Sequence, residues 1–199
     1  MVGLGKLADL VFCNILFCLC SLPVFTVGAA AAALFDCAMS ITEDMEEQLI
    51  VRQYWEAFKK NFKDATLEWL ILLAVIALLA VYAWAVNVLS GSLYRMYRVT
   101  FYVLLFLFLA GCQYVFPLQA RFRLGVGKTL KTAWLLAAAA LPFTFLGLLV
   151  LAAAVYISFF MNPNAVNSFV FLWAFAIIGV IAYVNSFFYL RAFRRLPKQ

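Results

Sequence analysis

The sequence predicts an all-α polytopic membrane protein, a transmembrane helical bundle that forms a single membrane domain over residues 1–199. Apolar residues make up 68% of the chain and charged residues 12%. A soluble domain has about half apolar and about a quarter charged residues. A chain of this size cannot cover so much apolar surface with its own core, so the remainder requires lipid. Its longest apolar stretches reach the roughly 20 residues that a spanning helix needs.

The N-terminal region, residues 4–44, predicts a broken helical hairpin. Residues 4–22 are long enough to span, Pro23 and Gly28 then interrupt the helix, and the apolar segment 26–42 returns. With the spans that follow, this hairpin gives six spans. The alternative is one span followed by a re-entrant helix, which gives five spans in all.

Residues 49–64 predict one amphipathic interfacial helix. Ile50, Tyr54, Phe58 and Phe62 follow each other at helical spacing, and basic and polar residues cover the other side. Aromatic residues on one face and lysines on the other are typical of a helix that lies in the membrane interface. An ordinary helix packed on the bundle is the alternative.

Two helical hairpins are predicted to follow, over residues 66–119 and 128–195. Within the second, residues 131–160 would form a helix about 45 Å long at 1.5 Å per residue, so it should tilt or kink. Pro142 is the expected kink site. The predicted spans of the two hairpins are 67–89, 99–119, 131–160 and 166–190.

The two hairpins share short sequence patterns at their ends. K-x-Φ-K-x-A, where Φ is apolar, begins at Lys60 and again at Lys128, and F-x-L-x-A-x-x-R begins at Phe116 and at Phe188. A duplication of one hairpin would explain the repetition. A biased composition of the membrane flanks would explain it equally well.

Lysine and arginine residues predict the orientation. In the six-span arrangement thirteen of them lie on one side, and only Arg95 and Arg98 lie on the other. Because basic residues concentrate in cytoplasmic loops, both termini are expected in the cytoplasm and the chain in the cell membrane. The residues expected to contact anionic lipid headgroups or a partner are Arg52, Lys59, Lys60, Lys63, Arg121, Arg123, Lys128 and Lys131. They sit at span ends rather than on one continuous face, so nucleic acid is not an expected partner.

Residue types needed for most enzymatic chemistry are missing. The chain has no histidine, and all nine acidic residues precede Trp69. Gly125 to Thr129 resembles the end of a phosphate-binding loop, but Phe122 occupies the position of the first glycine, so the nucleotide cradle cannot form. We therefore expect no enzymatic activity, no catalytic residue, no metal and no cofactor.

Polar residues inside apolar segments are the remaining candidates for function. Burying a polar or charged group in hydrocarbon is unfavourable, so such groups mark functional sites or helix contacts. We expect a candidate polar pathway around the broken hairpin, built from Asn14, Thr26, Asp36 and Gln113. Hydrogen bonding between helices is the alternative role of the amides.

Three segments carry a family resemblance: L-P-V-F-T-V-G at 22–28, F-P-L-Q-A-R-F at 116–122 and T-L-K-T-A-W-L-L-A at 129–137. In this order they resemble the YesL family of bacterial integral membrane proteins, over about residues 5–195. The resemblance implies a bacterial inner-membrane protein of uncharacterised activity that is associated with carbohydrate utilisation. Together with the missing catalytic groups and the incomplete phosphate-binding loop, this association leads us to expect a non-enzymatic accessory or regulatory component linked to carbohydrate uptake by an ABC importer, whose subunits would be its partners. A small oligomeric transporter or channel is the alternative, and it would make the chain a homo-oligomer.

Overall fold

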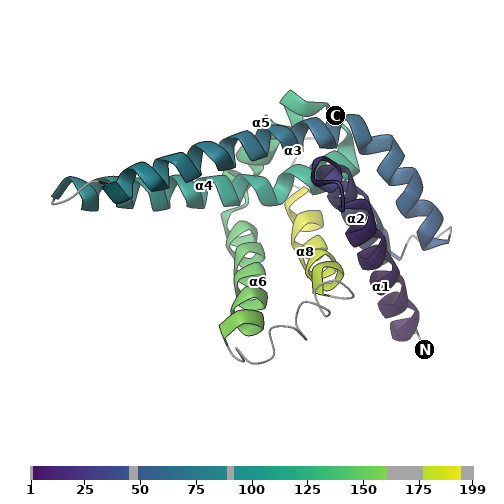
Figure 1. Ribbon diagram of the computed structural model, residues 1–199. Helices are drawn as coiled ribbons and strands as arrows, with labels where there is room; N and C mark the ends of the chain where they lie inside the picture. The colour runs from purple at the N-terminus through teal and green to yellow at the C-terminus, as the bar shows by residue number, and fades with distance from the viewer. Residues whose placement is uncertain (1, 45–48, 89–91, 161–176, 194–199) are drawn as a thin grey trace.

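The computed structural model describes residues 2–44, 49–88, 92–160 and 177–193. Within these ranges the chain is helical apart from short turns, so the predicted all-α class is confirmed there (Figure 1). The helices are α1 (Val2–Cys20), η1 (Val24–Thr26), α2 (Val27–Thr42), α3 (Ile50–Val88), α4 (Ser92–Phe122), α5 (Val126–Ala139), α6 (Leu141–Phe160) and α8 (Ile178–Phe193).

Helices α1 and α2 form the hairpin that the N-terminal sequence predicts. The turn between them is closed by Thr26, whose hydroxyl lies 2.5 Å from the Cys20 carbonyl oxygen and 2.7 Å from that of Pro23. At the open end, Lys6 of α1 forms an ion pair with Asp44, just beyond the end of α2. The two helices are therefore antiparallel, with their free ends held together by charge.

Helix α2 packs closely against the first half of α3. Its alanine-rich face is buried, and the Tyr54 hydroxyl donates to the Ala30 carbonyl oxygen at 3.2 Å. Near the end of α2 the Ser40 hydroxyl accepts a hydrogen bond from the Gln53 amide at 2.7 Å, whereas Gly28, in the first turn of α2, lies against the backbone of Ala65. Small side chains let two helix backbones approach this closely. The order of the contacts shows that α2 and α3 are antiparallel.

The predicted interfacial helix is not a separate element. Residues 50–88 form one helix of 39 residues, α3, because neither proline nor glycine occurs between Ile50 and Val88. Tyr54 is buried against the bundle, as the packed alternative expects, while Trp55 and Phe62 of the same segment are exposed. The first half of α3 thus has one face on α2 and an aromatic edge facing outward.

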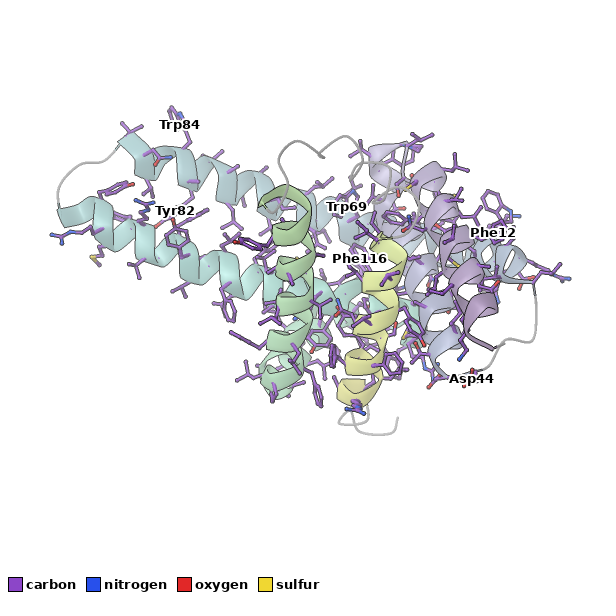
Figure 2. All side chains as sticks on the ribbon, turned by 90° about the horizontal axis from the view of Figure 1, so that it is seen from below. Phe12, Asp44, Trp69, Tyr82, Trp84 and Phe116 are labelled. Atoms are coloured by element: carbon purple, nitrogen blue, oxygen red, sulfur yellow. The ribbon has the colours of Figure 1, made fainter. Side chains whose placement is uncertain are left out.

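The second half of α3 and most of α4 form a long hairpin that extends away from the remaining helices (Figure 1). Tyr82 stacks on Phe101 of α4 at 6.1 Å, and Figure 2 shows Trp84 pointing away from the hairpin. Of the most apolar 18-residue stretch of α3, only 11% is buried. An apolar surface of this extent is typical of a helix that contacts lipid or other helices.

The predicted long span at 131–160 is two helices rather than one kinked span. α5 ends at Ala139, α6 begins at Leu141, and the two axes meet at 99°. Pro142 lies in the first turn of α6, where its missing N–H and its ring prevent α5 from continuing. The break therefore falls next to the predicted kink site, but the bend is far sharper than a kink.

Among the described residues, three helices have the length and composition of membrane spans: Val24–Thr42, Ile50–Val88 and Tyr94–Phe122. Counting the bent pair α5 and α6 as one span would add a fourth. These helices fit the helical membrane class. The beginning of the predicted span 166–190 lies outside the described residues, as do Arg194, Arg195 and Lys198 at the end of the second predicted hairpin.

Candidate functional site

The four residues of the predicted polar pathway contact different parts of the molecule. The Asn14 side-chain oxygen accepts a hydrogen bond from the Gly179 N–H of α8 at 2.7 Å. Thr26 closes the turn before α2, and Asp36 accepts from the Gln53 amide of α3 at 3.3 Å. Gln113 donates to the Thr144 carbonyl oxygen of α6 at 3.1 Å. The described contacts do not join these four side chains into one path; each fixes a different turn or pair of helices.

A polar contact between α4, α6 and α8 surrounds Gly147. A Cβ atom at Gly147 would lie 2.5 Å from the Gln113 side-chain oxygen and 3.7 Å from that of Asn185. Both oxygens are buried and have no hydrogen-bond partner among the described residues. The glycine therefore provides the space in which the Gln113 amide lies against α6, with the Asn185 amide close by.

The most unusual buried group is Glu68, near the middle of α3. Its side chain is fully buried, and in the described part of the chain neither carboxyl oxygen has a hydrogen-bond partner. Asn61 and Ala65 lie on the same buried face of α3, and the Asn61 side-chain oxygen has no partner in those ranges either. A carboxyl group that is buried without a donor or a cation is a functional candidate, because burying it as an anion is strongly unfavourable.

Helices α4 and α5 supply the polar side chains beside Glu68. The Thr129 side chain of α5 lies near the Glu68 carboxyl group without forming a hydrogen bond to it. The Thr129 hydroxyl is 2.9 Å from the side-chain oxygen of Gln119, on α4, and 3.1 Å from the Gly125 carbonyl oxygen. Thr129 and Gln119 are both buried. The three side chains thus form a buried polar cluster where α3, α4 and α5 meet, which we call the Glu68 cluster (Glu68, Gln119 and Thr129).

Sequence reasoning did not find the Glu68 cluster. Glu68 stood at the edge of a predicted span, where a carboxylate could remain in water. A signal was present, because Ala57, Asn61, Ala65, Glu68 and Leu72 recur at helical spacing and share one face. Only the pairing of that face with α2 and α5 shows that it is buried.

Two of the basic residues predicted to contact headgroups or a partner also form ion pairs within the chain. Arg121, at the end of α4, holds both carboxylate oxygens of Glu43 at 2.7 and 3.1 Å. This bidentate pair joins the end of α4 to the end of α2. Arg52 pairs with Glu56 one turn later on α3, at 3.0 Å.

The other predicted basic contacts are exposed. Lys59 lies over the Trp55 ring, 5.4 Å from its centroid. The exposed set is Lys59, Lys60, Lys63, Arg123, Lys128 and Lys131. These side chains lie on the first half of α3, at the end of α4 and in the first turns of α5. They remain available to anionic groups outside the chain.

The described residues contain no group of three or more histidine, cysteine, aspartate or glutamate side chains that could hold a metal ion. The five cysteines all lie in the described residues and form no disulfide there, and Cys13 and Cys37 are buried between helices. Small thiols in such positions act as apolar packing groups.

Comparison with known families gives a match over part of the chain. Residues 10–82 match the family described as "Protein of unknown function, DUF624". This is the domain family to which YesL proteins belong. The matched segment runs from α1 to the far half of α3 and includes Glu68. No curated protein and no solved structure matches the chain.

Proposed function

We propose that the chain is a multi-pass protein of the bacterial cell membrane with six spans and both termini in the cytoplasm. The ion pairs of Lys6 with Asp44 and of Arg121 with Glu43 support this topology. They bring the start of α1 and the ends of α2 and α4 to one side of the molecule. The exposed lysines at the start of α5 extend the basic character of that side, which is the character of cytoplasmic flanks.

We further propose that the protein is a non-enzymatic accessory or regulatory component of the YesL type, linked to carbohydrate uptake by an ABC importer. The observation that carries this proposal is the α3–α4 hairpin, whose apolar side chains are largely uncovered by the rest of the chain. Leu78, Val81 and Trp84 are among the most exposed of them. Transmembrane helices of a partner could cover this surface, and lipid would cover the remainder.

The exposed basic residues are the second element of the proposal. Lys59, Lys60 and Lys63 follow one another on the part of α3 that precedes the hairpin. Near a membrane surface, each such basic residue contributes about 1 kcal/mol to the free energy of binding to anionic headgroups. We propose that these lysines bind anionic lipid headgroups or an anionic surface of the importer.

Co-purification from the protein's own host tests the accessory role. The tagged protein would be extracted in mild detergent from cells grown on a complex polysaccharide, and its partners identified by mass spectrometry. We expect importer subunits in stoichiometric amounts. A deletion strain with unchanged sugar uptake and unchanged importer assembly would contradict the proposal.

A small oligomeric transporter or channel is the second candidate. The observation that favours it is Glu68, because buried carboxyl groups inside membrane helices often belong to ion or substrate pathways. Purified protein in liposomes separates the two functions. A transporter moves solute without other proteins, whereas an accessory component does not.

A further inference from the structure

The surroundings of Glu68 do not compensate a negative charge. On α3 the nearby ionisable group is Asp64, one turn earlier, which would repel a second anion. The α2 face opposite, from Gly28 to Ala33, has no ionisable side chain. On α4 the contact is the neutral amide of Gln119. On α5, Lys128 and Lys131 are exposed, and no ion pair in the described part of the chain includes Glu68.

The Glu68 cluster has one hydrogen-bond donor too few for its acceptor oxygens if Glu68 is ionised. Thr129 has a single hydroxyl proton, and the oxygens of Gln119 and Gly125 already lie at 2.9 and 3.1 Å from its Oγ1 atom. If Thr129 donated to an ionised Glu68 instead, the buried Gln119 oxygen would lose this donor. A proton on Glu68 supplies the missing donor, since a neutral carboxyl group can donate to the Thr129 oxygen. Thr129 then remains free to donate to Gln119.

We propose that Glu68 is an intramembrane proton-binding site. When protonated, its carboxyl group can turn to donate to the nearby Thr129 hydroxyl, which donates to Gln119 at 2.9 Å, and this chain of hydrogen bonds would join α3, α5 and α4. Loss of the proton leaves a buried anion next to Asp64, so water or a cation must enter between α3 and α5. Proton occupancy at Glu68 therefore controls how tightly these helices pack. This site is independent of whether the chain acts as an accessory component or as a transporter.

Dicyclohexylcarbodiimide tests the site on the intact protein, because this apolar reagent reacts with protonated carboxyl groups in apolar surroundings. The carboxyl proton moves to a carbodiimide nitrogen, and a carboxyl oxygen bonds to the central carbon. The resulting O-acylurea rearranges to a stable N-acylurea. The full chain in lipid nanodiscs would be treated over a range of pH and its peptides analysed by mass spectrometry.

We expect the adduct on Glu68 at neutral pH, with labelling that decreases as the pH rises. Asp36→Asn should leave the labelling unchanged, and Glu68→Gln should abolish it. Thr129→Val should shift the pH midpoint of labelling, and Thr129→Ser, which keeps the hydroxyl, should preserve the wild-type midpoint.

Three results would overturn the inference. An unlabelled Glu68 in folded wild-type protein at neutral pH would show that it carries no proton there. Protection by sodium ions at constant pH would identify a metal-cation site instead. An unchanged pH midpoint of labelling in Thr129→Val would show that Thr129 does not stabilise the protonated form of Glu68. Because the main measurement uses the wild-type protein, it does not depend on the folding of a Glu68 variant.

Discussion

At the scale of single residues, small side chains and buried amides set the distances between helices. Gly28 lets α2 lie on the backbone of α3, and Gly147 makes room for the Gln113 amide. Asn14 reaches from α1 to a backbone N–H in the first turn of α8. The sequence identified Asn14 and Gln113 as deep polar residues. It did not identify their partners, because these lie 165 and 31 residues away along the chain.

Gly28→Ala tests the contact between α2 and α3. The new Cβ atom would overlap the Ala65 carbonyl oxygen and lie 2.6 Å from the Trp69 Cβ atom, so the helices must separate. We expect a loss of about 1–3 kcal/mol in the free energy of unfolding, the usual range for overpacking. Thermal unfolding in detergent measures it. Gly127→Ala is the matched control, because a Cβ atom at this position on α5 would have no described atom within 4 Å. Equal stability of the two variants would contradict the contact.

Asn14→Ala tests the link between α1 and α8. The substitution leaves the Gly179 N–H without its side-chain acceptor, so we expect a loss of about 0.6–2 kcal/mol in stability, as for other hydrogen bonds between membrane helices. Asn87→Ala, at an exposed position near the end of α3, should leave stability unchanged. The same unfolding measurement compares them, and a wild-type transition in Asn14→Ala would refute the role of the amide.

At the scale of helices, local patterns predicted which segments are helical better than they predicted where helices bend or end. The apolar runs and the 3.6-residue periodicity of residues 50–64 depend only on neighbouring residues, and they led to the correct secondary structure. The 99° turn between α5 and α6 depends also on Thr144, whose hydroxyl lies 3.0 Å from the Ala137 carbonyl oxygen and 3.1 Å from that of Ala140. Pro142 signalled an interruption, but the direction of α6 is set by its packing on α4 and α8.

The burial of Glu68 could not be predicted for a related reason. Its hydrophobic neighbours on α3 could equally have faced lipid or water at the edge of the membrane. Only the antiparallel pairing of α2 and α3, together with α5, covers that side of the helix. Long-range pairing of helix faces is not contained in the periodicity of one segment.

Charge reversal tests the joint between the ends of α2 and α4. Arg121→Glu places two carboxylates together and should lower stability by about 1 kcal/mol, the upper range for an exposed pair. Combining it with Glu43→Arg restores opposite charges and should recover most of the loss. Lys128→Glu, on the exposed start of α5, is the control. If the double variant is no more stable than Arg121→Glu in thermal unfolding, the ion pair does not join these helices.

At the scale of the whole molecule, the long α3–α4 hairpin runs across the direction of α6 and α8 in both views (Figures 1 and 2). The remaining helices lie around the base of this hairpin, where the ion pairs and the Glu68 cluster also lie. In a membrane, this arrangement exposes the hairpin to lipid and neighbouring helices. The proposed partner contact depends on it.

Cysteine labelling tests the topology. In a variant without the five native cysteines, Asn87→Cys should react with an impermeant maleimide added to intact spheroplasts, because the far end of α3 lies outside the cell in the six-span arrangement. Gly127→Cys should react only after the membrane is permeabilised. Reaction of Gly127→Cys in intact spheroplasts would show that the proposed orientation is wrong.

Photo-crosslinking from the hairpin in living cells tests the central claim most directly. A benzophenone amino acid would replace Leu78, which is 70% exposed on α3, and in a control protein Leu19, which is 57% exposed on α1. The account predicts that position 78 captures a membrane subunit of a sugar importer in cells grown on polysaccharide, and that position 19 does so much less. Adducts with lipid alone, or with a second copy of the chain alone, would contradict the accessory role, and adducts with a second copy would favour the oligomeric transporter.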